Sequence, residues 1–256
     1  MKFLLISSNK DLASKNIASH LKEYFDIFET DKELLELKSS DLEDADYYIF
    51  LSKHRSKANQ PSLTVHTPGN LTENNDFGGN PKEVCPCDAI LNTLLLKNIY
   101  KNYNIYYENN KISKFDVSFE VVHHSPTDLN APTVFVEIGS SEKEWILKEA
   151  GEIIAKSVLE TIEMIKNRDY EDRLKVIGFG GGHYAPKFTK LALEYDKYYF
   201  GYLIPKYASV SEDVLNQLVN KMEVDKVLID WKGCRGEDKK RYMEFFKNKG
   251  IDVERV

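Results

Sequence analysis

Apolar and polar positions along this chain alternate between two periods, and the alternation predicts repeated strand–helix units. Short runs of β-branched, aromatic or other apolar residues predict strands at residues 2–7, 47–51, 117–122, 133–138, 174–179, 198–204, 226–229 and 251–254. Apolar residues at helical spacing predict helices at residues 12–24, 88–103, 141–166, 186–194, 211–221 and 236–249. This order is typical of a layered α/β fold built on a mostly parallel sheet.

The domain organisation follows from the absence of any Gly/Ser linker. We therefore expect one α/β domain over residues 1–256. Residues 52–84 are polar and carry little regular pattern, which predicts a long loop region. Loops of that length inside a compact domain are usually functional or mobile.

Composition excludes several classes of protein. No apolar run is long enough for a membrane span, and the apolar start at residues 3–6 is too short for a signal peptide, so we expect a cytoplasmic protein. The net charge of −6 argues against nonspecific binding to a DNA duplex, although one local basic patch could still hold a nucleic acid. Three cysteines, an odd and low number, argue against a disulfide framework.

The densest candidate chemistry is a glycine-rich loop after the strand predicted at residues 174–179. Gly180, Gly181 and Gly182 are followed directly by His183, and Pro186 could begin a helix. Glycine N–H groups beside a helix start can cradle an anion or an oxyanion, and histidine titrates near neutral pH. The loop also fits a dinucleotide-binding pattern formally, but no acid follows the next strand to bind a ribose.

Histidines form the second candidate set. Five of the six stand in loop-like or strand-end positions, namely His54, His66, His123, His124 and His183. In open α/β sheets, ligand sites form at the carboxyl ends of strands. Neighbouring residues on a strand point to opposite faces, so the pair His123-His124 can serve one site only if its strand has already turned.

A carboxylate adds to this set. Glu137 interrupts an otherwise apolar strand, where a lone buried charge is costly. It could be a general base, a metal ligand, the partner of a cation or a residue at an exposed strand end. Histidine with carboxylate is a usual hydrolytic zinc set, although the chain has neither an HExxH helix nor a CxxC pair.

Basic residues form two groups. Lys53, Arg55 and Lys57, with Lys187 and Lys190, flank the candidate site and could guide phosphates. The second group comprises Lys232, Arg235, Lys239, Lys240 and Arg241. Runs of this kind are usually solvated faces.

Taken together, these motifs resemble the archaeal and plant type of D-aminoacyl-tRNA deacylase. The matching segments are Ser52-Lys53-His54-Arg55-Ser56, Leu63-Thr64-Val65-His66 through Gly69-Asn70, His123-His124-Ser125-Pro126-Thr127, Phe135-Val136-Glu137-Ile138-Gly139-Ser140 with Trp145, Gly180 through Thr189, and Ile229-Asp230-Trp231-Lys232-Gly233. The chain departs from the family pattern at Ser125, where the family usually has glycine, and at Pro68, where it often has threonine. Neither change removes a titratable group.

The resemblance implies a fold and an activity. It implies a three-layer α/β/α, phosphorylase/hydrolase-like fold with a mixed, mostly parallel sheet. It also implies a cytoplasmic, zinc-dependent hydrolase that cleaves the ester between a D-amino acid and the 3′ end of tRNA. We further expect a monomer that binds neither DNA nor a membrane.

Roles within the site follow as hypotheses. His183, Glu137 and His124 are the expected catalytic residues, and His66, His123 and Glu137 the expected zinc ligands. The expected substrate-binding residues are Gly180, Gly181, Gly182, Lys53, Arg55, Lys187 and Thr189, with the glycine N–H groups stabilising the oxyanion.

Two other functions stay open on the residues alone. One is a zinc peptidase or a nucleoside-phosphorylase-like enzyme, which would cleave amides or require phosphate. The other is a noncatalytic RNA- or nucleotide-binding module, which would bind tRNA and release no amino acid. Deacylation of a charged tRNA, with and without a chelator, distinguishes all three.

Overall fold

The protein contains a six-stranded sheet at its N-terminal end. The computed structural model describes residues 1–57 and 59–256. The strand order is β2-β1-β3-β6-β4-β5, and only the β4–β6 pairing is antiparallel. The strands are β1 (Phe3–Ser8), β2 (Ile27–Thr30), β3 (Tyr47–Arg55), β4 (Ser62–His66), β5 (Asp116–Phe119) and β6 (Thr133–Ser140).

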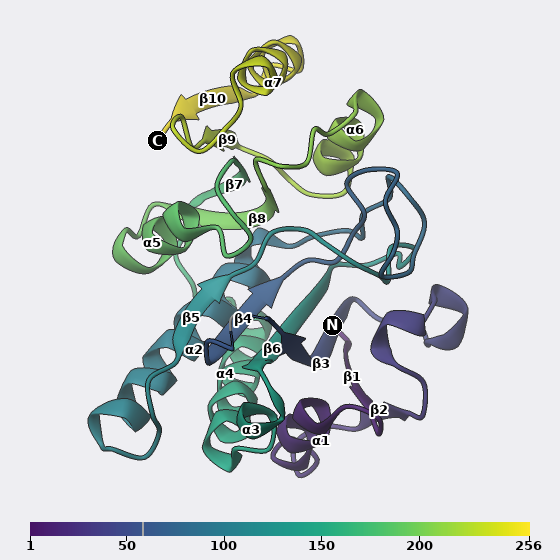
Figure 1. The fold of residues 1–256 in the computed structure, drawn as a ribbon, viewed down its shortest axis with the longest axis vertical. Coiled ribbons are helices and arrows are strands. Elements are labelled where there is room, and N and C mark those ends of the chain that lie inside the picture. The colour runs from purple at the N-terminus through teal and green to yellow at the C-terminus, as the bar shows by residue number, and fades with distance from the viewer. Residues whose placement is uncertain (58) are drawn as a thin grey trace.

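A second, four-stranded sheet forms the C-terminal end, and all its pairings are parallel. Its order is β10-β9-β7-β8. The strands are β7 (Leu174–Phe179), β8 (Tyr198–Ile204), β9 (Lys226–Ile229) and β10 (Asp252–Arg255). Figure 1 shows this sheet at one end of the molecule and helices α1 to α4 at the other.

Seven α-helices and two short 3₁₀ turns connect the described strands. They are α1 (Leu12–Ser19), η1 (Leu34–Glu36), η2 (Ser39–Asp41), α2 (Ala89–Glu108), α3 (Glu142–Trp145), α4 (Lys148–Asn167), α5 (Pro186–Glu194), α6 (Glu212–Asn220) and α7 (Gly236–Asn248). Asp11 and Asp88 cap α1 and α2 by accepting backbone N–H groups, as their positions before apolar helical runs require. None of the described helices is both long and apolar enough to cross a bilayer.

One face of the six-stranded sheet carries the main core. Helices α1, α2 and α4 contact its strands, and the inward residues are aliphatic, such as Leu51, Val65 and Val136. Burying this apolar surface supplies most of the driving force for folding.

The opposite face of the same sheet is polar near its centre. Register places Ser52 beside Glu137, and Glu137 beside Thr64. His54 and His66 follow two residues further along their own strands, so period-two alternation puts all five side chains on one face. The sheet therefore offers a polar floor that the helices leave uncovered.

The segment after β5 joins the two sheets. The backbone N–H of Glu120 donates to Val65 in the first sheet. The N–H groups of Val121 and Val122 donate to the carbonyls of His183 and Leu203 in the C-terminal part, at 2.9 Å each. We call this joint the seam.

The α/β class and the mixed, mostly parallel sheet are confirmed. Three details differ from the sequence prediction. The region 52–84 is not one loop, because β3 continues to Arg55 and β4 occupies Ser62–His66. The helix predicted at 141–166 is two helices, α3 and α4, and β2 was not predicted.

Candidate active site

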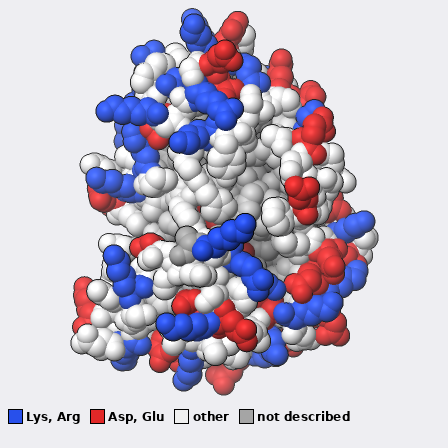
Figure 2. All heavy atoms as spheres, viewed as in Figure 1, with Lys and Arg blue, Asp and Glu red and all other residues white. Residues whose placement is uncertain are grey.

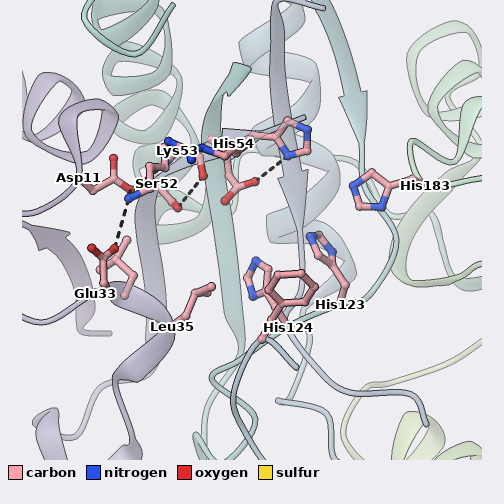
Figure 3. A pocket seen from close by; sticks show the side chains of 13 residues that line it. Asp11, Glu33, Leu35, Ser52, Lys53, His54, His123, His124 and His183 are labelled. Atoms are coloured by element: carbon pink, nitrogen blue, oxygen red, sulfur yellow. Dashed lines mark hydrogen bonds and ion pairs between the residues drawn. The ribbon is translucent and has the colours of Figure 1, made fainter. Parts of the chain in front are cut away.

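A cavity of about 580 Å³ opens over the polar face of the six-stranded sheet. His54, His123, His183 and Glu137 form its titratable floor, Leu34, Leu35 and Phe77 form an apolar wall, and the remaining lining residues are Asp11, Glu33, Ser52, Lys53, Arg55 and His124. Figure 3 shows His54, His123 and His183 converging from three separate segments.

Glu120 is the buried carboxylate at the centre of the site. Three imidazole nitrogens approach it: His183 Nε2 at 2.9 Å, His54 Nδ1 at 3.1 Å and His123 Nε2 at 3.4 Å. Its side chain has no exposed surface, while that of His183 is 34% exposed. His183 therefore connects this carboxylate with the open cavity.

Glu137 lies next to this group on β6. Its Oε2 is 3.6 Å from His54 Nδ1, and the Nε2 on the other side of that ring is 3.0 Å from the Tyr184 hydroxyl. The Trp145 indole donates to the His54 carbonyl at 3.0 Å, which anchors the end of β3. Both the imidazole ring and the backbone carbonyl of His54 are therefore fixed by neighbouring side chains.

His66, His123 and His124 form a second, tighter group. The Nε2 atoms of His66 and His124 are 3.0 Å apart, and the rings of His66 and His123 stack with centroids 4.2 Å apart. The strand has already ended at Phe119, and His124 has a left-handed backbone with φ of 50°. This turn allows both histidines of the pair to line one cavity, as the sequence argument required.

These three histidines also share a lowered pKa. Burial is the main cause that lowers the pKa of His123 to about 4, and it lowers the pKa of His66 and His124 well below the ordinary value. Repulsion among the neighbouring imidazoles acts in the same direction. Neutral imidazole is the form that ligates metal ions.

The two carboxylates shift in opposite directions. Burial tends to raise the pKa of Glu120, but the surrounding histidines outweigh it and lower that pKa. Burial and the neighbouring charge of Glu120 raise the pKa of Glu137. For His54, burial lowers the pKa, yet the hydrogen bond to Glu137 and the charges of both carboxylates leave it raised. Of the two carboxylates, Glu120 is therefore the one that favours the negatively charged form.

Several buried polar atoms in and next to this floor lack hydrogen-bond partners. Among the described residues, neither oxygen of Glu120 nor Nδ1 of His66 makes a well-aligned hydrogen bond. Three groups place one ligand atom per residue within 4.8 Å of one another: His66 with His123 and His124, His54 with Glu120 and His183, and His66 with Glu120 and Glu137. The floor is therefore able to hold a metal ion.

The glycine loop differs from the expectation that its N–H groups face the substrate. Gly180 N–H donates to Ile204 O at 2.8 Å and Gly181 N–H donates to Gly233 O at 2.9 Å. Both residues have positive φ, 115° and 79°, which explains the need for glycine. Two of the three expected oxyanion donors are thus committed to the fold.

Thr189 and Lys187 also differ from expectation. The Thr189 hydroxyl accepts the Phe119 N–H and donates to the Tyr184 carbonyl, so it is a structural residue at the seam. Lys187 forms an ion pair with Asp230 at 3.2 Å.

The other two basic residues expected to bind substrate lie at the cavity. Lys53 and Arg55 line the cavity, and the Lys53 ammonium also pairs with Glu33 at 3.2 Å. The Arg55 guanidinium lies over the Trp145 ring, 5.1 Å from its centroid.

Sequence reasoning missed Glu120 and gave no role to His54 or Tyr184. The signal for Glu120 was present, because it follows a β-branched and aromatic run just as Glu137 interrupts one. Tyr184 had no comparable signal, since a tyrosine in a loop is common.

Fold and cavity define a class of protein. This is an α/β protein whose cavity ends on buried imidazoles and carboxylates, the side chains that hydrolytic enzymes use for acid–base and metal chemistry. Comparison with known proteins identifies the family: the family model for D-aminoacyl-tRNA deacylase matches residues 41–254, and the chain belongs to this family.

Relatives support this membership over the whole chain. A protein of Methanocaldococcus jannaschii named D-aminoacyl-tRNA deacylase is 82% identical, and the alignment covers 100% of both chains. A Methanococcus vannielii protein of the same name is 55% identical over 100% of both. One from Pyrococcus abyssi is 38% identical over 79% of this chain and 71% of its own.

A solved structure has the same fold. It is described as a conserved protein of unknown function and superposes with a TM-score of 0.88 at 27% identity. The match covers 99% of this chain and 95% of the other.

Proposed function

We propose that the protein hydrolyses the ester bond of D-aminoacyl-tRNA, releasing the free D-amino acid and tRNA. Family membership supports the reaction. One observation supports the proposal that the reaction takes place in this cavity. That observation is the Glu120–His183 contact of 2.9 Å, which links a buried carboxylate to an imidazole that reaches the open space.

His183 is the general acid–base in this proposal. The imidazole accepts a proton from the attacking water and returns it to the ribose oxygen that leaves. Glu120 orients the ring and stabilises the imidazolium that forms, as the carboxylate does in other carboxylate–histidine pairs. Glu137 stays as a proposed catalytic partner, whereas His124, expected from the sequence to be catalytic, is proposed below as a metal ligand.

Zinc is the proposed cofactor, and the residues present fit it. Two nitrogens on one tetrahedral zinc at about 2.0–2.1 Å stand about 3.3 Å apart, and His66 Nε2 and His124 Nε2 are 3.0 Å apart. His66, His123 and His124 would hold the ion, with Glu120 or Glu137 beside it. A bound zinc supplies Lewis acidity, which favours ionisation of water and polarises the ester carbonyl.

The rest of the cavity serves binding. Leu34, Leu35 and Phe77 provide apolar surface for the substrate on one side. Lys53 and Arg55 lie where they can attract phosphates, and Figure 2 shows Lys and Arg side chains bordering a hollow in this face. Gly182 remains as a proposed contact for the 3′ end. A tRNA substrate also implies a cytoplasmic location. We propose that the protein acts as a monomer, since every residue named for the site comes from one chain.

The test is hydrolysis of D-tyrosyl-tRNA and L-tyrosyl-tRNA by the purified protein. We expect release of D-tyrosine only, with no phosphorolysis of nucleosides and no cleavage of dipeptides. His183→Ala should lower kcat by about 10²–10⁴-fold while leaving the circular dichroism spectrum unchanged. Full turnover by this variant would remove His183 from the mechanism.

A further inference from the structure

Phe77 is the anomalous side chain of the cavity wall. It lines the cavity and yet 67% of its surface is exposed. Of the other two apolar wall residues, Leu34 is only 3% exposed and Leu35 is partly buried. The Phe77 ring therefore offers an open apolar surface at the edge of the proposed catalytic floor.

The main chain at Phe77 is held in place by Ser125. The Phe77 carbonyl accepts the Ser125 N–H at 3.3 Å and its hydroxyl at 2.8 Å. The same hydroxyl contacts the carbonyl of Leu35, on the neighbouring part of the wall. Ser125 therefore ties two wall segments together, directly beside the catalytic histidine pair.

Two glycines make this close approach possible. Gly78 and Gly79 have positive φ of 80° and 75°. A Cβ at Gly78 would lie 2.9 Å from Ser125 Oγ, and one at Gly79 would lie 2.6 Å from Thr127 Cγ2. No other residue type could follow Phe77 without moving it.

Side-chain hydrogen bonds complete the support. The Asn70 amide donates to the carbonyls of Gly78 and Asn80 at 2.8 and 3.1 Å, and Asn80 N–H donates to Thr127 Oγ1 at 2.9 Å. Thus the Gly69-Asn70 and Ser125-Pro126-Thr127 motifs, which perform no chemistry themselves, build the loop that presents Phe77.

We propose that Phe77 is the stacking platform for the 3′-terminal adenine of the substrate tRNA. The inference rests on the proposed function. The ester must reach the buried floor, so the groups on either side of it extend toward the mouth. A ring whose main chain is fixed in this way suits a group that never changes, and every charged tRNA ends in the same adenosine while the amino acid varies. Planar bases stack on aromatic side chains without needing polar partners.

The kinetic test compares Phe77→Ala with the wild type on D-tyrosyl-tRNA and D-alanyl-tRNA. Stacking holds substrate and transition state equally, so KM should rise and kcat should stay unchanged. We expect kcat/KM to fall about 5- to 150-fold, the range measured for base–aromatic stacking, and by the same factor for both substrates. Phe77→Trp should restore it.

Tyr195→Ala is the matched control, because Tyr195 is 54% exposed at the end of α5. This variant should behave as the wild type. A loss in Phe77→Ala confined to D-tyrosyl-tRNA would assign the ring to the amino-acid side chain and overturn the proposal. Wild-type protein inactive on both substrates would instead refute the proposed function.

A fluorescence test follows stacking directly. Uncharged tRNA carrying 2-aminopurine at its terminal position should lose fluorescence on binding the wild type and Phe77→Trp. Binding to Phe77→Ala should leave the fluorescence unquenched. Unquenched fluorescence in the saturated wild-type complex would overturn the proposal even if deacylation is confirmed.

Discussion

Glu120 concentrates negative charge where three imidazoles converge. Each of His54, His123 and His183 brings one ring nitrogen within 3.4 Å of its carboxylate. Removing the charge while keeping the shape therefore isolates its electrostatic contribution.

Glu120→Gln should lower kcat on D-aminoacyl-tRNA by about 10²–10⁴-fold, because an amide cannot stabilise the imidazolium of His183. Single-turnover deacylation measures this loss. Asp238→Asn is the control, since Asp238 is also buried but pairs with Arg241 on α7. Equal kcat for Glu120→Gln and wild type would show that the carboxylate is only structural.

At the scale of single residues, the sequence pointed to histidines that lie together at the cavity, but it did not indicate where the glycine N–H groups point. A titratable residue inside or next to an apolar run, such as Glu137, can be recognised in the sequence because burying its charge is costly. The direction of a glycine N–H cannot be recognised in this way, since it depends on distant partners. Gly180 and Gly181 donate to Ile204 and Gly233, 24 and 52 residues away along the chain.

Helices and strands followed their periodic patterns, with two instructive exceptions. Ser62 and Thr64 alternate with Leu63 and Val65 in β4, but this period-two pattern spans only five residues inside a polar stretch and therefore did not stand out. The break between α3 and α4 lies where the Asn16 amide donates to the carbonyls of Trp145 and Leu147, at 2.9 and 2.8 Å. Both depend on what surrounds the element rather than on its own sequence.

Gly151 on α4 packs directly against Asn16, and this contact yields a stability prediction. A Cβ at Gly151 would lie 2.2 Å from Asn16 Oδ1. Gly151→Ala should therefore lower the free energy of unfolding by about 1–3 kcal/mol through overpacking. Chemical denaturation measures the change.

Gly236 provides the matched control for that substitution. Among the described atoms, none lies within 4 Å of a Cβ built at Gly236, the first residue of α7. Gly236→Ala should be neutral or stabilise by about 0.4–1 kcal/mol, since alanine has less freedom when unfolded. Similar destabilisation by both substitutions would contradict the packing argument.

At the scale of the whole molecule, the strands form two separate sheets. Periodicity along the chain could not reveal this division. Both halves show the same strand–helix alternation. Which strands pair is decided by contacts between distant segments, such as β4 entering antiparallel beside β6. The class of fold was therefore predictable, and the number of sheets was not.

Metal binding is expected to stabilise the whole molecule. An ion that binds only the folded state adds about 2.7 kcal/mol when its concentration is 100 times Kd. Chelator should thus lower Tm, and zinc should restore it.

Two variants test whether this stabilisation comes from the floor histidines. His123→Ala should lose the response of Tm to zinc, whereas His20→Ala, changed at the end of α1, should keep it. A Tm insensitive to chelator and zinc in the wild type would contradict the proposed site.

The seam brings residues from both sheets together in the candidate site. His183 comes from the C-terminal part, and Glu120, the carboxylate that it contacts, follows β5 of the first sheet. Docking of the two parts and binding of a ligand that touches both are therefore thermodynamically linked, and the coupling is reciprocal. Such a ligand favours docking by the same factor by which docking increases its affinity. A distant substitution that loosens the seam is therefore expected to weaken binding without touching the substrate.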